Sequence, residues 1–146
     1  MIKIIMEGGH QYCTFYLDKT FFGIQVDRVQ EIIRFQEMAI VPMSPDIVKG
    51  LINLRGQIIT GIDLRKCLDF NTEYANKKPM NVIVKSGAEA FSLLVDRIGD
   101  VLDLSEDLRE NKPDTLSGKV RDLISDVYKL ENKLLLVLDI DKIIDL

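Results

Sequence analysis

Apolar and polar positions alternate along this chain in short runs that turn-forming residues separate. Alternation with a period of two predicts half-buried β-strands, and a turn signal between two such runs predicts a hairpin. Turn signals of this kind lie at 19–20, 86–87 and 131–132. The segments expected as strands are 12–18, 21–26, 50–54, 57–62, 80–84, 90–95, 101–104, 121–130 and 133–139.

Residues 49–65 carry the most informative of these patterns. The apolar runs 50–54 and 57–62 are separated by Arg55 and Gly56, and glycine supplies the backbone freedom that a tight turn needs. An arginine therefore stands at the tip of an otherwise apolar hairpin, where it is well placed to meet a protein partner. A structural arginine that bonds loop carbonyls fits the same pattern equally well.

Helical signals are short. A period near 3.6 residues links the apolar positions 26, 29, 32 and 33, and Asp27 stands where an N-cap is typical. Asp63 is expected to cap a helical turn over 63–68. Asp139 or Asp141 is expected to cap a helix at the C-terminus. The polar segment 105–118 is expected to be an exposed loop.

The composition is typical of one globular domain. The chain has 146 residues, and 47% of them are apolar. The net charge of −4 and the pI near 5.0 argue against a nucleic-acid partner, which requires a basic face. No apolar run is long enough to cross a bilayer, and the N-terminus lacks the features of a signal peptide. We therefore expect a cytoplasmic protein without direct membrane contact.

The residues that carry chemistry form no catalytic pattern. The one histidine, His10, has no His or Cys near it in the sequence, so we expect neither a metal site nor a cofactor. Cys13 and Cys67 lie in apolar patterns without metal or redox spacing, which favours buried free thiols. Carboxylate pairs such as Asp139 and Asp141 are interpreted as caps or solvated faces. Nothing in the sequence supports an enzyme.

Three segments resemble the CheW-like family of chemotaxis coupling proteins. The family signature is a glycine, aliphatic residues, Asn-Leu-Arg-Gly, an aliphatic strand and then Asp-Leu-Arg, and further matches lie at 23–33 and 93–98. The three matches keep the family's order over about residues 12–145. The chain has Thr60-Gly61 where many members have Pro-Val, and glycine loosens a strand interior. The matching signature residues are Gly50, Asn53, Leu54, Arg55, Gly56, Asp63, Leu64 and Arg65.

The resemblance implies a mainly β fold. Members of the family have two SH3-like five-stranded β-barrel lobes packed side by side, and the many short strands expected here agree with small barrels. We expect short helices beside the lobes and one helix at the C-terminus. A single CheW-like domain over 1–146 would then contain lobes at about 12–70 and 79–140, intertwined or packed, with a polar linker near 71–78.

The resemblance also implies a receptor-binding site. In the family, the segment that matches Val29 and Glu31 lines a groove that grips the receptor. The opposite wall matches the segment around Ile98, and the family arginine that matches Arg55 belongs to the same site. From the pattern alone, Val29 is a core valine and Glu31 a solvated glutamate. Further positions expected to contribute to receptor binding are Val26, Cys13 and Gly50, although plain strand geometry explains the glycine as well.

Other motif residues are expected to be structural. Asp63 and Arg65 are expected to provide a helix cap and an ion pair that fix the exit of the hairpin. Asp96 and Arg97 are interpreted in the same way. The remaining residues assigned to the motif are Asn53, Leu54 and Gly56.

The resemblance implies a non-catalytic adaptor. Such a protein couples the cytoplasmic tip of methyl-accepting chemoreceptors to the regulatory domain of the histidine kinase CheA, and its partners recruit it to membrane receptor arrays. An apolar groove rimmed by an arginine and a glutamate suits a receptor helix. The sequence names no kinase-binding residue. Two alternatives stay open: a coupling protein of a non-flagellar CheW-type pathway, and an SH3-like module for nucleic acid or another ligand, which would need a basic, aromatic-lined face.

Overall fold

The computed structural model describes residues 10–72 and 78–145. Its strands are β1 (His10–Leu17), β2 (Thr20–Gln25), β3 (Val29–Ile33), β4 (Val48–Leu54), β5 (Gln57–Ile62), β6 (Met80–Ser86), β7 (Glu89–Val95), β8 (Arg97–Leu104), β9 (Arg109–Glu110), β10 (Ile124–Lys129) and β11 (Leu134–Leu138). Its α-helices are α1 (Leu64–Cys67), α2 (Gly118–Leu123) and α3 (Ile140–Ile144), and its 3₁₀ helices are η1 (Val26–Arg28) and η2 (Glu106–Leu108).

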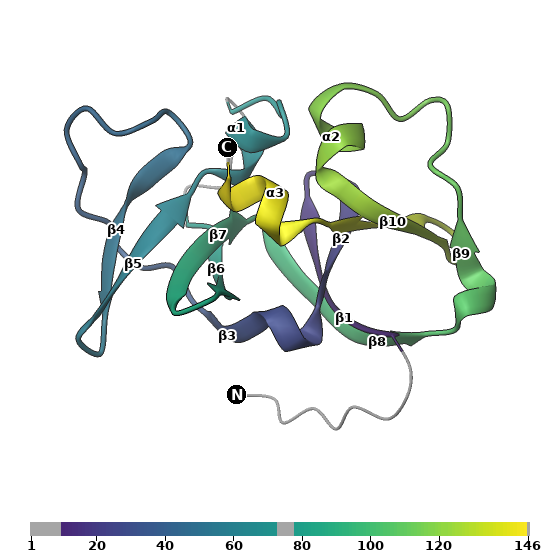
Figure 1. Ribbon diagram of the computed structural model, residues 1–146, viewed down its shortest axis with the longest axis horizontal. Coiled ribbons are helices and arrows are strands. Elements are labelled where there is room, and N and C mark those ends of the chain that lie inside the picture. Colours follow the sequence, from purple (N-terminus) through teal and green to yellow (C-terminus); the bar gives the residue numbers. More distant parts are fainter. Residues whose placement is uncertain (1–9, 73–77, 146) are drawn as a thin grey trace.

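The strands form two curled sheets that lie side by side (Figure 1). Sheet A has the strand order β8-β1-β2-β11-β10-β9, and sheet B has the order β3-β6-β7-β5-β4. We call the two halves built on them lobe A and lobe B. The expected mainly β fold of two lobes with short helices is confirmed. Sheet A has six strands rather than five because the two-residue strand β9 pairs with β10 at its edge.

The two lobes are intertwined along the chain. Sheet A contains β1 and β2 from the beginning of the chain together with the late strands β8, β9, β10 and β11. The strands between them in sequence, β3 through β7, form sheet B. Two pairings link the early and late strands of lobe A: β1 pairs with β8 in antiparallel orientation, and β2 pairs with β11 in parallel, with Phe22 opposite Leu136. The lobes therefore do not coincide with the segments 12–70 and 79–140. The connection expected as a linker at 71–78 joins elements of lobe B, and its residues 73–77 lie outside the described part of the chain.

Sheet B curls until the chain beyond one edge reaches the other edge. β3 is one edge strand and β4 is the other. The segment after β3 crosses to β4, where the backbone groups of Ala39 and Leu51 exchange hydrogen bonds of 2.9 and 2.8 Å. This closure gives lobe B an apolar interior of its own. The interior side chains are Ile52, Ile59, Ile83 and Ala90, with Ile33, Met38 and Leu54 packed against them.

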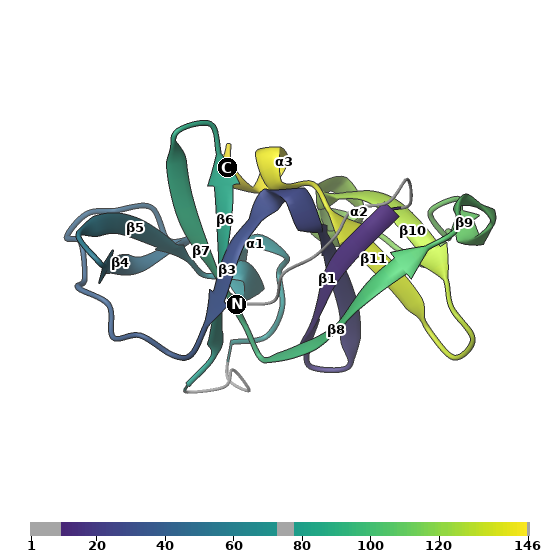
Figure 2. The same ribbon diagram turned by 90° about the horizontal axis from the view of Figure 1, so that it is seen from below.

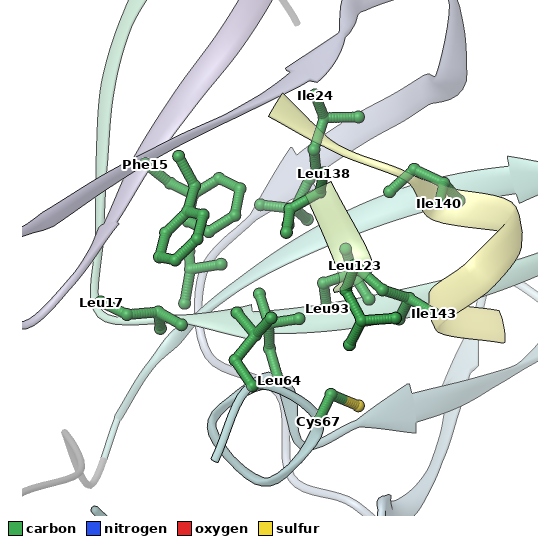
Figure 3. Packing of buried hydrophobic residues seen from close by; sticks show 14 of the residues in the cluster. Phe15, Leu17, Ile24, Leu64, Cys67, Leu93, Leu123, Leu138, Ile140 and Ile143 are labelled. Atoms are coloured by element: carbon green, nitrogen blue, oxygen red, sulfur yellow. The ribbon is translucent and has the colours of Figure 1, made fainter. Parts of the chain in front are cut away.

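A larger apolar core joins the lobes (Figure 3). Phe15 and Ile24 reach it from sheet A, and Leu93 reaches it from sheet B. Leu64 of α1 and Ile143 of α3 close it from the helices. Each of these side chains is at most 1% exposed. Because full burial of one such side chain stabilises the fold by about 1.5–3 kcal/mol, the shared core holds the lobes together as one unit.

Several local predictions are confirmed. The side chain of Asp63 caps α1 by accepting a hydrogen bond from the backbone nitrogen of Lys66. Asp139 caps α3 in the same way. The hairpins β4–β5 and β6–β7 form where the turn signals place them. The expected strand 121–130 begins only at Ile124, because α2 occupies the residues before it.

The helix expected over residues 26–33 is wrong. Only η1 is helical there, and Gln25 rather than Asp27 occupies its N-cap position. The rest of the segment is strand β3, which pairs with β6. β-Branched residues fit a pleated, half-buried strand, and the ladder with β6 satisfies the backbone groups of this segment.

Candidate partner-binding surface

A β-bulge in β3 separates two residues that the sequence placed in one groove. Val29 lies opposite Val84 of β6 and Glu31 lies opposite Ile83, so Gln30 is an extra residue in the pairing. Residues opposite each other share a face of a sheet, and successive residues alternate between faces. Val29 therefore lies on the side of the core between the lobes, and Glu31 lies on the side of the lobe B interior.

The same bulge explains why this segment looks helical in the sequence. Ile32 lies opposite Val82, and it packs against the interlobe core as Val29 does. In a regular strand, residues three apart point to opposite faces. The extra residue brings Val29 and Ile32 onto the same face, and an apolar spacing of three is the signature of a helix.

Partly exposed apolar side chains of η1, β3 and β8 border the junction of the two lobes, and the ribbons of β3, β1 and β8 can be followed in Figure 2. Val29 and Ile98 both pack against the interlobe core, and Ile98 lies opposite Phe15 of β1. Val26 belongs to η1, which contacts both β1 and β6. We call Val26, Val29 and Ile98 the interlobe surface. It contains residues of both lobes.

Arg55 and Glu31 form an ion pair between the β4–β5 turn and β3. Nη2 of Arg55 lies 2.5 Å from Oε2 of Glu31. The Arg55 side chain is 67% exposed and that of Glu31 is 18% exposed. The hydrogen bond from Arg55 holds the pKa of the Glu31 carboxyl below its usual value. Two residues expected at the receptor site therefore bind each other in this structure.

Acid unfolding tests this ion pair. The unfolded pKa of a glutamate is about 4.3, and the folded pKa of Glu31 is lower. The pair therefore stabilises the fold above about pH 4.3, and this contribution is lost as the pH falls through the lowered pKa. As the pH falls from about 5 to about 3, we expect the free energy of unfolding to decrease less in Glu31→Gln than in the parent. Urea midpoints measured across this pH range test the prediction. Glu37→Gln, at an exposed loop position, is the control. Identical pH profiles for Glu31→Gln and the parent would contradict the prediction.

The turn that carries Arg55 has the geometry its sequence predicts. Arg55 and Gly56 have φ angles of 51° and 86°, as a two-residue hairpin turn of the primed type requires. Oδ1 of Asn53 accepts a hydrogen bond of 3.0 Å from the Gly56 nitrogen. Leu54 packs against the lobe B interior. These contacts hold the arginine at the tip of the hairpin.

Gly50 makes room for the protein's own backbone. A Cβ atom at Gly50 would lie 2.7 Å from the carbonyl oxygen of Ala39 and 2.8 Å from Cβ of Met38. Gly61 lies opposite Gly50, and a Cβ atom there would lie 2.6 Å from Sδ of Met38. The glycine at the position where many family members have valine thus accommodates Met38, and β5 keeps its pairing on both sides.

Substitution of Gly50 is expected to damage the fold. In Gly50→Ala the new methyl group meets backbone, which cannot rotate away, so we expect the free energy of unfolding to fall by about 2–3 kcal/mol. In Gly61→Ala the methyl group meets the flexible end of Met38, so the loss is expected to be about 1 kcal/mol. Urea unfolding measures both. Parental stability with weakened receptor binding in Gly50→Ala would instead make Gly50 a contact position.

Cys13 lies beneath the interlobe surface rather than on it. It is 5% exposed and lies between Ile24 of β2 and Val101 of β8. Cys13 and Cys67 are both buried free thiols, as the sequence predicts. Burial raises the pKa of both thiols, that of Cys67 to about 11. Cys13 therefore supports the surface from inside and presents little area to a partner.

Arg65 connects three parts of the chain. Its side chain is 4% exposed, and Nη2 lies 2.5 Å from Oδ1 of Asp18 and 2.6 Å from Oδ2 of Asp96. Nη1 donates a 2.6 Å hydrogen bond to the carbonyl oxygen of Asn71. Asp18 lies in the β1–β2 turn of lobe A, and Arg65 lies in α1. No sequence pattern pointed to Asp18, because the contact joins segments 47 residues apart.

The expected ion pairs are therefore rearranged. Asp63 caps α1, while Arg65 of the same motif pairs with Asp18 and Asp96. Arg97 lies 3.8 Å from the centre of the Tyr16 ring, in a cation–π contact. Asp96 and Arg97 thus stabilise the fold through different neighbours.

The sequence analysis did not predict the three most exposed large apolar side chains among the described residues. Ile40, Met43 and Ile58 are 85%, 103% and 60% exposed. Ile58 lies on the outer face of the β4–β5 hairpin, opposite Asn53, whereas Ile40 and Met43 lie in the segment between β3 and β4. In β5 the sequence does not distinguish Ile58 from its neighbour Ile59, because both are isoleucines and only Ile59 is buried. The irregular segment offered no signal for the other two either.

Metal ligands and membrane-spanning helices are the remaining features to consider in residues 10–72 and 78–145. No group of three or more His, Cys, Asp and Glu side chains in these ranges is placed to hold a metal ion. His10 begins β1 and lies 3.0 Å from a carboxylate oxygen of Glu106. Among the described helices, none is long and apolar enough to cross a membrane.

The fold is thus a pair of β-lobes joined through a shared core, with exposed apolar side chains on lobe B. The model of the CheW-like domain family matches residues 11–146, and the chain belongs to this family. Its curated relatives are chemotaxis proteins.

Curated relatives and a solved structure agree with this assignment. The chain is 30% identical over 146 residues to the chemotaxis protein CheW of Treponema pallidum, covering 95% of this chain and 84% of that protein. It is 31% identical over 134 residues to the chemotaxis protein CheW of Thermotoga maritima, covering 90% and 85%. The crystal structure of the scaffolding protein TtCheW from Thermoanaerobacter tengcongensis superimposes with a TM-score of 0.79 at 22% identity, over 95% of this chain and 90% of that one.

Proposed function

We propose that this chain is a non-catalytic adaptor that couples methyl-accepting chemoreceptors to the histidine kinase CheA. It acts in the cytoplasm, and its partners hold it at the membrane receptor arrays. The observation that carries the proposal is the interlobe surface, where partly exposed apolar side chains of both lobes pack against one shared core in a chain of the CheW-like family.

The interlobe surface suits the helical tip of a receptor. Val26 and Val29 anchor a helix from the lobe B side, and Ile98 anchors it from the lobe A side. Apolar anchors of this kind supply the affinity when an amphipathic helix binds a groove. The exposed Arg55, held by Glu31 at the hairpin tip, adds a charge that sets the register of the helix. The receptor contacts are therefore Val26, Val29, Ile98 and Arg55, with Glu31 as the residue that orients the arginine.

A coupling protein needs a second surface for the kinase. Ile40, Met43 and Ile58 project from lobe B and expose apolar area that a partner would remove from water. We propose that the regulatory domain of CheA binds at these three side chains. Weak contacts of each adaptor with both partners gain strength when many copies assemble in one array.

Binding measurements with purified partners test the function. We expect the parent chain to bind both a receptor-tip fragment and the regulatory domain of CheA. Arg55→Ala is expected to weaken receptor binding several-fold and to leave kinase binding unchanged, with only the small loss of stability that removal of the ion pair with Glu31 causes. Arg34→Ala, which removes another exposed arginine, is the matched control. Absence of binding to both partners would overturn the function.

The same assay separates the alternatives. Binding only to the receptor and kinase of a second array would assign the chain to a non-flagellar pathway. Binding to a labelled oligonucleotide would favour a nucleic-acid module, although the net charge of −4 opposes it.

A further inference from the structure

A second β-bulge lies in β8, beside the interlobe surface. In the pairing of β1 with β8, Cys13 lies opposite Val101 and Phe15 lies opposite Ile98. One residue separates the members of these pairs along β1, and two residues separate them along β8. The strand with the surplus residue is bulged, and bulges commonly serve to re-aim a side chain.

The bulge determines which face of β8 carries Ile98 and Val101. Ile98 and Val101 are three residues apart, so a regular strand would turn them to opposite faces. Their partners in β1 are two residues apart and share a face. The bulge therefore brings Ile98 and Val101 onto one face, and both are partly exposed there. Val101 thus extends the interlobe surface along β8.

Thr14 and Gly99 form the inner side of this bulge. Thr14 is 1% exposed, and its hydroxyl donates a 2.5 Å hydrogen bond to the carbonyl oxygen of Asp100. Gly99 lies directly against the same hydroxyl, because a Cβ atom at Gly99 would be 2.5 Å from Oγ1 of Thr14. A buried hydroxyl requires a partner, and a bulge disturbs the regular ladder of backbone groups. The contact therefore satisfies a buried donor and a displaced carbonyl together.

We propose that Thr14 and Gly99 are positioning residues for receptor binding. The Thr14 hydroxyl, seated on Gly99, holds the bulge in the register that turns Ile98 and Val101 toward one partner. Thr14 itself does not reach the surface. The inference rests on the proposed function, because the partner it serves is the receptor tip.

Two substitutions of Thr14 test the role of its hydroxyl in the full chain. Thr14→Val keeps the shape of the side chain and removes the hydrogen bond, whereas Thr14→Ser keeps the hydroxyl. We expect Thr14→Val to speed amide hydrogen exchange at residues 98–101 and to lower affinity for the receptor-tip fragment about tenfold, with kinase binding unchanged. Thr14→Ser is expected to behave as the parent does. Thr60→Val, the same change in β5 of lobe B, is the matched control.

A double-mutant cycle tests the contact between the two residues. The methyl group of Gly99→Ala collides with Oγ1 of Thr14, and this atom is absent in Thr14→Ala. We therefore expect Gly99→Ala to reduce receptor affinity more in the parent than in the Thr14→Ala background. Equal reductions in both backgrounds would show that the two residues act independently, against the proposal.

The remaining outcomes are equally distinct. Unchanged exchange at residues 98–101 in Thr14→Val would show that the hydroxyl does not hold the bulge. Faster exchange with parental receptor affinity would leave the bulge without a role in binding and overturn the proposal. A parent chain that binds no receptor fragment would overturn the proposed function and the positioning role with it, while the exchange data would still report whether Thr14 holds the bulge.

Discussion

Arg65→Met is expected to lower the free energy of unfolding by about 3–5 kcal/mol, because it removes a buried cation from two carboxylates. The Arg65 side chain is 4% exposed and contacts Asp18 of lobe A together with Asp96, which lies between β7 and β8. The substitution leaves both carboxylates facing a thioether. Urea unfolding followed by circular dichroism measures the change.

An exposed arginine provides the control for this loss. Arg34→Met removes the same charge from an exposed position after β3, and it is expected to change stability by less than about 0.5 kcal/mol. The loss of stability in Asp18→Asn is expected to lie between the losses in Arg65→Met and Arg34→Met. The Asp18 side chain is 46% exposed, so water replaces part of the lost interaction. A loss below about 1 kcal/mol in Arg65→Met would show that the buried pair does not hold the lobes together.

The double substitution Val29→Ala with Ile98→Ala is expected to weaken receptor binding about a hundredfold. Each change removes two or three carbon atoms from an anchor, which corresponds to about tenfold in affinity. The two residues belong to different lobes, so their effects are expected to add. Isothermal titration with the receptor-tip fragment measures the single and double variants.

The matched control is an apolar residue on the other candidate surface. Ile58→Ala removes a side chain of the same size as Ile98, and Ile58 is 60% exposed on the outer face of lobe B. It is expected to leave receptor affinity unchanged and to weaken binding of the kinase regulatory domain. Loss of receptor affinity in Ile58→Ala, with parental affinity in the double variant, would show that the receptor binds the outer face of lobe B instead.

Hairpins and caps were predictable because their signals are local. Arg55 and Gly56 define a two-residue turn, and Asp63 meets its backbone partner three residues away. The bulges are not local in this sense: the extra residue in β3 gives Val29 and Ile32 the spacing of a helix, and only the partner strand shows otherwise. The division into lobes was equally hidden, because it depends on the pairing of β1 with β8 and of β2 with β11.

The site shows a similar division between pattern and context. The resemblance singled out Arg55 and Glu31 without indicating that they form an ion pair with each other. It also grouped Gly50 with the contact residues, whereas the nearest atoms to its missing Cβ belong to the protein's own chain. Such distinctions depend on which segments cross in space, and one sequence does not contain that information.

The pairing of β2 with β11 also constrains how the protein folds during synthesis. The strands of lobe B follow one another without interruption from Val29 to Val95, so this lobe completes its pairing while the rest of the chain is still being translated. β1 and β2 precede the strands of lobe B in the chain, yet the open edge of β2 is covered only after Leu134–Leu138 has been made. Such distant pairing slows folding and leaves a strand edge open to association with other nascent chains. The β1–β2 hairpin therefore gains its pairing with β8 on one side well before β11 covers the other side, and the edge of β2 is the part of lobe A that stays open longest.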